Sequence, residues 1–148
     1  MPRHTVHIAA PAADVYARIT DPRRRPEWLP ELIGTSDVPD QPLREGDRFV
    51  GYAELLGHRL VGHSEVRAAD AASGRLEERV VIGARFTTTW DVTPTTTDGS
   101  ACRVTHDIDV EFPQGPLGNV VRWLLTRYLD RLQRRGLQRL AGRSGRQE

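Results

Sequence analysis

Residues 101–140, ACRVTHDIDVEFPQGPLGNVVRWLLTRYLDRLQRRGLQRL, change their hydrophobic period once, and that change decides the fold. Up to Phe112 the apolar side chains alternate with polar ones, as in a β-strand with one buried face. Beyond Pro113 and Pro116 they recur every three or four residues, which is the spacing of an amphipathic helix. The broad apolar stripe from Leu117 to Leu132 predicts a helix of about 25 residues lying on a sheet.

Turn signals divide the preceding chain into short strands with an alternating pattern. Turns rich in glycine or proline at this spacing are typical of consecutive antiparallel strands. From residue 32 onward the chain therefore predicts an antiparallel meander of about six strands. The turns fall at 39–42, 57, 73–74, 83 and 98–99.

The tight turn at 82–84 determines which side chains of its two strands face each other. Matching their apolar faces sets three cross-strand pairs, and it brings His106 of the next strand close to the level of Thr88 or Trp90. The predicted pairs are Val80 with Phe86, Glu78 with Thr88, and Leu76 with Trp90.

Two short helices are expected between the first strand and the meander. Pro11 is well placed to begin one helix, and Asp21-Pro22 gives the start signal for a second. Pro26 and Pro30 keep this second helix short, because proline prevents regular continuation. Trp28 is therefore predicted on a constrained turn between helix and sheet.

This order of elements resembles the helix-grip fold of the START and Bet v 1-like superfamily, particularly its bacterial polyketide cyclase/dehydrase-like branch. The matching segments are IAAPAADVY at 8–16, DP at 21–22, PEWLP at 26–30, REGDRF at 44–49 and WDV at 90–92. The resemblance implies one α+β domain over residues 1–148, in which a curved antiparallel sheet of about seven strands wraps around the C-terminal helix. The tail after about residue 141 is expected to be flexible. The resemblance also implies a cavity that takes lipids, hormones, polyketides or other hydrophobic ligands. It does not imply one reaction, because members include carriers as well as cyclases.

Three polar side chains, Ser64, Glu78 and His106, lie on faces that are otherwise apolar. Glu78 and His106 are predicted to flank the central strand with their backbones about 10 Å apart, which leaves room for a ligand. Such a carboxylate and imidazole could act as acid and base in enolisation, aldol cyclisation or loss of water. Tyr128 is the third candidate catalytic residue, because its hydroxyl could point from the helix into the cavity. The predicted ligand-binding residues are Trp28, Ser64, Thr88, Trp90, Val104, Ile108 and Leu124.

The same residues also have structural interpretations. His106 could be a core histidine bonded to a hydroxyl group or a buried water. Glu78 could turn to solvent at a bulge, or it could pair with a buried arginine. Tyr128, Trp28 and Trp90 could pack as core residues without touching a ligand.

Composition excludes several kinds of site. Apolar residues make up 38% of the 148 residues and charged residues 28%, as in ordinary globular domains, and no apolar signal segment opens the chain, which predicts a cytoplasmic protein. Cys102 is the only cysteine, which excludes an intrachain disulfide and a thiolate metal cluster. All 21 basic residues are arginine, so a Schiff-base lysine is absent. His58 and His63 are predicted at strand ends or on the outer face, away from His106, and no metal or cofactor is expected.

Two functions follow from these observations. The first is a cofactor-independent cyclase, aromatase or dehydratase of bacterial specialised metabolism with a polyketide-like substrate. The second is a carrier that binds a lipid or polyketide without chemistry. A third interpretation gives the arginine-rich C-terminal end an acidic partner or RNA, but a net charge of +1 favours a solvated helix end and no nucleic-acid partner. A monomer or homodimer without membrane insertion is expected, since no run approaches the roughly eighteen apolar residues of a membrane span.

Overall fold

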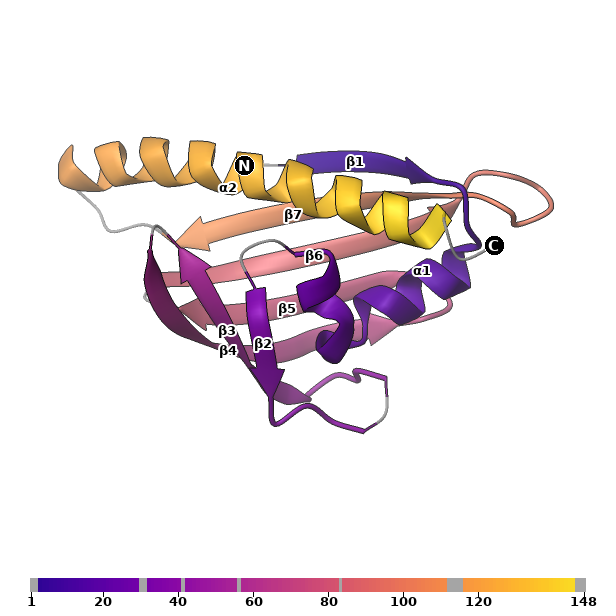
Figure 1. The fold of residues 1–148 in the computed structure, drawn as a ribbon, viewed down its shortest axis with the longest axis horizontal. Coiled ribbons are helices and arrows are strands. Elements are labelled where there is room, and N and C mark those ends of the chain that lie inside the picture. Colours follow the sequence, from indigo (N-terminus) through magenta and orange to yellow (C-terminus); the bar gives the residue numbers. More distant parts are fainter. Residues whose placement is uncertain are drawn as a thin grey trace.

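The computed structural model describes residues 3–29, 32–40, 42–55, 57–82, 84–111 and 116–145. Its strands follow the predicted order, with an α-helix and a 3₁₀ helix after the first strand and a long helix at the C-terminal end (Figure 1). The elements are β1 (Arg3–Ile8), α1 (Ala12–Ile19), η1 (Pro22–Glu27), β2 (Leu32–Ser36), β3 (Arg48–Leu55), β4 (His58–Asp70), β5 (Arg75–Ile82), β6 (Ala84–Pro94), β7 (Cys102–Glu111) and α2 (Pro116–Gly145).

The seven strands form one antiparallel sheet in the order β1-β7-β6-β5-β4-β3-β2. The predicted register is confirmed, because Val80 pairs with Phe86, Glu78 with Thr88, and Leu76 with Trp90. His106 pairs with Trp90 across β6 and β7, one of the two levels predicted for it. Alternation along each strand then places Glu78, Trp90 and His106 on one face, which we call the inner face.

The turn between β4 and β5 depends on a glycine. Gly74 has a φ of +72°, and a Cβ atom built on it would lie 2.1 Å from the carbonyl oxygen of Val92. Gly74 and Val92 are also joined by a hydrogen bond, in which the Val92 N–H donates to the Gly74 carbonyl at 2.8 Å. Only glycine allows both the left-handed backbone and this close approach, which ties the β4–β5 turn to β6.

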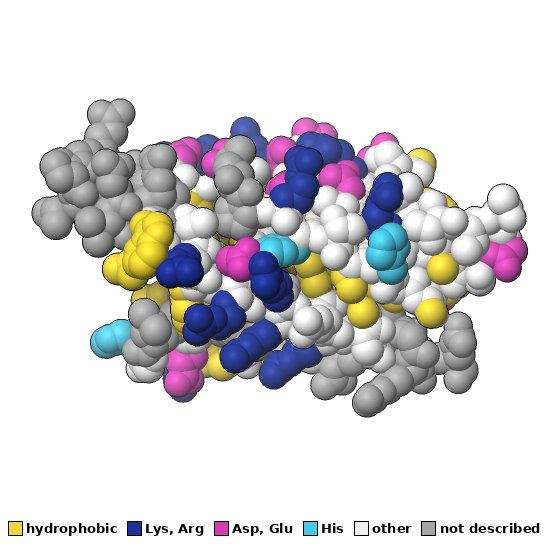
Figure 2. All heavy atoms as spheres, turned by 90° about the horizontal axis from the view of Figure 1, so that it is seen from above, with side chains coloured by type: hydrophobic (Ala, Val, Ile, Leu, Met, Phe, Trp, Pro, Cys, Tyr) yellow, Lys and Arg dark blue, Asp and Glu magenta, His cyan; other side chains and the backbone are white. Residues whose placement is uncertain are grey.

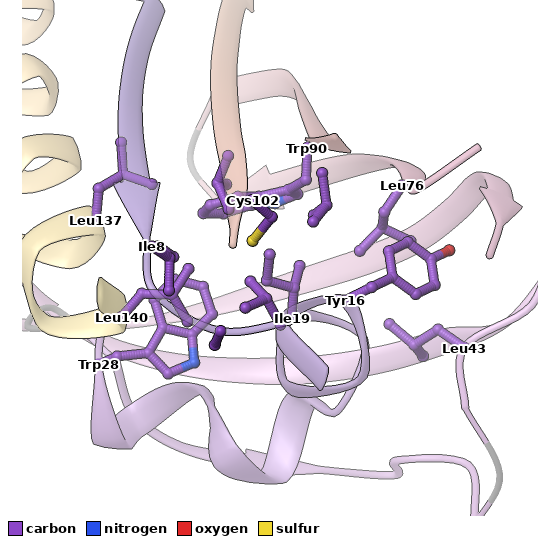
Figure 3. Close-up of a cluster of buried hydrophobic side chains, with 14 of the residues drawn as sticks. Ile8, Tyr16, Ile19, Trp28, Leu43, Leu76, Trp90, Cys102, Leu137 and Leu140 are labelled. Carbon is purple, nitrogen blue, oxygen red and sulfur yellow. The ribbon is translucent and has the colours of Figure 1, made fainter. Parts of the chain in front are cut away.

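The hydrophobic core fills one end of the inner face, beneath α1 and the C-terminal half of α2 (Figure 3). Trp28, on the turn that ends η1, is fully buried beside Ile8 of β1 and Leu140 of α2. The constrained turn predicted for Trp28 is therefore present, and its ring belongs to the core. Other members of the same cluster are Val15, Ile19, Leu76, Trp90, Val92, Cys102, Val104 and Leu137.

The helix α2 differs from its prediction in length and in the face that it buries. It has 30 residues rather than about 25, and it packs chiefly on β1. Its buried side chains include Gln133, Leu137 and Leu140, which lie beyond the predicted stripe. Leu124 precedes Gln133 by nine residues, or two and a half turns, and so points to the opposite side of the helix. The prediction that Leu124 faces the sheet is therefore wrong, and its side chain is 56% exposed.

Within the described ranges, no helix combines the length and the apolar character that crossing a membrane requires.

Leu140→Ala should destabilise the protein by about 2–5 kcal/mol, because it leaves a cavity in the core. Leu124→Ala, on the exposed side of the same helix, is the matched control and should change stability by less than about 0.5 kcal/mol. Urea unfolding of the two variants gives the comparison. Equal losses of stability would contradict the assignment of the buried face of α2.

Candidate functional site

The inner face of the sheet has three zones along its strands. Val66, Leu76, Trp90, Val92 and Val104 are buried in the core zone. The next inner positions along the strands carry polar side chains, and we call them the polar band. Beyond the polar band the inner positions carry half-buried apolar side chains, and we call these the apolar end. The polar band consists of Ser64, Glu78, Thr88 and His106, all of them buried. The apolar end consists of Leu60, Val80, Ile82, Phe86 and Val110.

Glu78 forms a buried ion pair with Arg25 of η1. One guanidinium nitrogen donates to Oε2 at 2.8 Å, and Nη2 donates to Oε1, so the contact is bidentate. Arg25 also donates from Nε and Nη2 to the carbonyl of Ile19, at 3.1 and 3.0 Å. Its guanidinium carbon lies 5.3 Å from the centre of the Phe49 ring. Two hydrogen bonds between buried opposite charges fix the orientation of both side chains.

This pairing changes the chemistry available to Glu78. A carboxylate whose two oxygens both accept from a guanidinium has its charge satisfied and is not placed to exchange protons with a ligand. Of the interpretations open for Glu78, the structure has the pair with a buried arginine. Through Arg25, Glu78 therefore positions η1 on the sheet.

His106 is held between an aromatic ring and an amide. Its imidazole stacks on the indole of Trp90 with 3.6 Å between ring centres and 14° between the ring planes. Trp28 meets Trp90 edge to face, with ring centres 5.3 Å apart. The Gln133 side chain of α2 lies over the imidazole, with its Nε2 3.2 Å from His106 Nδ1. The three rings and the amide form one contiguous buried group.

The contacts of Gln133 determine the tautomer of His106. The amide nitrogen also donates to the His106 backbone carbonyl at 3.2 Å, and a carbonyl oxygen can only accept. The atom that faces both Nδ1 and this carbonyl is therefore the NH₂ group, so Nδ1 accepts. In the neutral ring the proton then lies on Nε2, which has no hydrogen-bond partner among the described residues. Nε2–H is thus a buried donor without an acceptor.

Burial keeps His106 uncharged at neutral pH. Loss of hydration, with smaller contributions from the positive charge of Arg25 and from the nearby His4, lowers the pKa of His106 from 6.5 to about 3. A neutral imidazole of this kind donates a hydrogen bond through Nε2 but accepts a proton only in strong acid.

A second contact fixes the middle of α2 to the sheet near His106. His4 pairs with His106 across β1 and β7 and so lies on the inner face. Its Nε2 bonds the carboxylate of Asp130 of α2. Because Asp130 and Gln133 are about one turn apart, these contacts define the position of α2 along β1 and β7.

The remaining predicted site residues fall into different zones. Ser64 and Thr88 belong to the polar band, and Ile108 lies at its border with the apolar end. Val104 is fully buried in the core. Tyr128 is half-buried on α2. The structure thus brings Ser64, Thr88, Ile108 and His106 onto one surface, whereas Leu124 faces away from it.

Surface hollows lined by described residues also occur on the outer face of the sheet. One includes His63, Glu65 and Arg79, and another includes Thr87 and Asp107. These side chains alternate with the inner ones and face away from His106. In the described part of the chain, no group of three or more histidine, cysteine or acidic side chains is placed to hold a metal ion.

Two important residues of the site, Arg25 and Gln133, were missed by the sequence analysis. Arg25 is the last of three consecutive arginines between two prolines, and no repeating hydrophobic pattern indicates which of the three faces the sheet. Gln133 could have been found as a polar residue on the apolar stripe, had the stripe been extended past Leu132 to Leu137 and Leu140.

Glu78→Gln should destabilise the protein by about 3–5 kcal/mol, because it leaves the Arg25 charge buried without its partner. A double variant, Arg25→Met with Glu78→Met, should recover most of this loss, because it removes both charges together. Glu65→Gln, at an exposed pair with Arg67, is the control and should cost less than about 1 kcal/mol. Urea unfolding is the measurement. A double variant as unstable as Glu78→Gln would show that the pair is not the cause.

His106 should make the protein less stable in acid. Below pH 6.5 the unfolded chain protonates this histidine, whereas the folded protein does not until about pH 3. The free energy of unfolding should therefore fall by up to about 1.4 kcal/mol per pH unit in this window from His106 alone. His106→Gln should flatten the slope by this amount. Parallel slopes for the wild type and His106→Gln would contradict a neutral His106.

Comparison with known proteins agrees with the architecture. Residues 3–145 match the family described as polyketide cyclase/dehydrase and lipid transport. No curated protein sequence matches the chain.

Several solved structures share the fold at low sequence identity. The Zhui aromatase/cyclase of a Streptomyces species is 19% identical, with a TM-score of 0.74 over 97% of this chain and 92% of that one. A protein of Thermus thermophilus is 21% identical, with a TM-score of 0.72 over 96% and 97%. The di-domain aromatase/cyclase BexL is 20% identical, with a TM-score of 0.71 over 95% of this chain but 44% of its own, so this chain spans less than half of BexL. On the family match and the helix-grip architecture together, the chain belongs to the polyketide cyclase/dehydrase and lipid transport family.

Proposed function

We propose that this protein binds an apolar small molecule bearing carbonyl or phenol oxygens, such as a polyketide, between the apolar end of the sheet and α2. The observation that carries the proposal is the buried, neutral His106, whose Nε2–H has no acceptor among the described residues. A buried donor without an acceptor costs about 1–3 kcal/mol, and a ligand oxygen would remove this cost.

The zones of the inner face support a ligand with two kinds of surface. The side chains of the apolar end are half-buried, so contact with the apolar rings or chains of a ligand would remove more of their surface from water and favour binding. The polar band beyond it supplies hydroxyl groups from Ser64 and Thr88 together with the His106 donor. A pure hydrocarbon would leave the polar band unsatisfied, whereas an oxygenated ring system matches both zones. The family description and the aromatase/cyclase structures are consistent with this class of ligand.

The same contact favours a second function, that of a cyclase, aromatase or dehydratase. A hydrogen bond from a neutral imidazole to a ketone stabilises the negative charge that develops on oxygen during enolisation and aldol addition. His106 would then act as an electrophile, and a proton acceptor is still required. The half-buried Tyr128 of α2 is the remaining candidate from the sequence for contact with the reacting groups. A carrier needs only the binding step, so binding is the function proposed first.

Binding of the hydroxyanthraquinone emodin should depend on His106. In a Trp123→Phe background, quenching of Trp28 and Trp90 reports contact with the buried rings. His106→Phe should weaken binding about 3–10-fold, since it removes one hydrogen bond of about 1 kcal/mol. His63→Phe makes the same change on the outer face and should have no effect. Equal affinity in the His106→Phe and His63→Phe variants would rule out the proposed contact.

An activity assay would distinguish an enzyme from a carrier. The substrate is a synthetic 1,3,5,7-tetraketone, and the ultraviolet absorption of the phenol product measures its turnover. An enzyme should lose turnover in His106→Phe, whereas a carrier binds the compound and leaves it unchanged.

A further inference from the structure

Two large apolar side chains are exposed next to each other on α2. Trp123 is 57% exposed and Leu124 is 56% exposed. The Arg127 guanidinium lies over the Trp123 ring, 4.9 Å from its centre. With Arg131 and Arg134 these side chains line one shallow hollow on the helix surface. Neighbouring apolar side chains of this size and exposure make this hollow the candidate contact surface of α2.

The charge of the chain is divided between α2 and the rest. Residues 116–145 contain seven arginines and one acidic residue, Asp130. Residues 1–115 contain thirteen arginines and eighteen acidic residues. The small net charge of the whole chain therefore conceals a strongly basic helix on an acidic body. The only acidic side chain of the helix is already bonded to His4 and Arg134.

The basic and apolar side chains share one side of the helix. Trp123, Leu124, Arg127, Arg131 and Arg135 are all exposed, and their positions fall within about a third of the helical circumference. Figure 2 looks onto α2 and shows a row of basic side chains along the helix with an apolar group at one end. Figure 1 shows that the first turns of α2 extend past the ends of β6 and β7.

We propose that this face of α2 docks on the surface of an anionic phospholipid bilayer, with Trp123 and Leu124 entering the headgroup region and the arginines contacting lipid phosphates. Tryptophan favours the bilayer interface, and arginines on one face of a surface helix bind anionic lipids. The basic side chains lie along one side of α2, an arrangement that matches the flat, negatively charged surface of an anionic bilayer. An acidic peptide would satisfy the arginines but would leave Trp123 and Leu124 without an apolar environment. Docking is independent of the proposed ligand.

The docking face lies close to the apolar end of the sheet. α2 runs parallel to β1, because Asp130 bonds His4 while Leu140, further along the helix, packs near Ile8, further along the strand. Its N-terminal half therefore lies toward the end of the sheet that carries Phe86 and Val110. A bilayer bound at Trp123 would adjoin the half-buried apolar side chains. If the proposed function holds, an apolar ligand could pass between bilayer and protein without crossing water.

Cosedimentation with phosphatidylcholine vesicles, with and without 30% phosphatidylglycerol, tests the docking. The protein should bind the anionic vesicles at least tenfold more tightly, and 0.5 M salt should release it. Trp28 and Trp90 are buried, so a blue shift of tryptophan emission on binding reports Trp123. Replacing Trp123 and Leu124 by alanine should weaken binding about tenfold.

Two triple variants that remove equal positive charge test whether vesicle binding depends on this face of α2 or on the overall charge of the protein. The triple variant Arg127→Gln, Arg131→Gln, Arg135→Gln should lose at least tenfold in affinity, since each arginine near an anionic surface contributes about fivefold. The triple variant Arg48→Gln, Arg67→Gln, Arg103→Gln removes the same charge from exposed positions of the sheet and should bind as the wild type does. Soluble polyglutamate should leave the emission unchanged. Equal losses in both triple variants, absence of vesicle binding, or the same blue shift with polyglutamate would overturn the proposal.

Discussion

The buried ion pair between Arg25 and Glu78 organises the rest of the site. It joins η1 to the middle of β5, and the additional bonds from Arg25 to the Ile19 carbonyl fix the end of α1 at the same point. This anchoring sets the position of the turn that carries Trp28. The Trp28 ring then meets Trp90, on which His106 stacks. The ion pair thus positions the ring contacts from Trp28 to Trp90 and from Trp90 to His106, which connect the helices to β7.

The same ion pair determines what kind of chemistry the polar band supports. Arg25 donates to both oxygens of Glu78, and its positive charge disfavours a proton on His106. A pocket built for proton exchange would keep its acid and base near neutrality. Here Glu78 is held by Arg25 and His106 stays neutral, an arrangement that suits recognition of a ligand oxygen and stabilisation of charge on it.

The sequence predicted the fold and the register well because both follow from side-chain period. Alternation placed Glu78 opposite Thr88 and His106 beside Trp90, and both placements are confirmed. The partners of these residues were harder to predict. Arg25 lies in a 3₁₀ helix bounded by prolines, where no repeated face distinguishes one arginine from its neighbours. The face of α2 was also misjudged for Leu124, because a helix stripe must be followed to the residues that contact the core.

The two halves of α2 meet different physical requirements. Gln133 and Asp130 tie its middle to His106 and His4, and the C-terminal half then closes the core with Leu137 and Leu140. The N-terminal half passes beyond these contacts, so folding alone does not cover Trp123 and Leu124. Covering them with another surface would contribute up to about 1.5–3 kcal/mol each, a gain that folding alone does not make. A helix that closes the core with one half, exposes Trp123 and Leu124 on the other and carries arginines along its length is therefore better explained by folding and binding together than by folding alone.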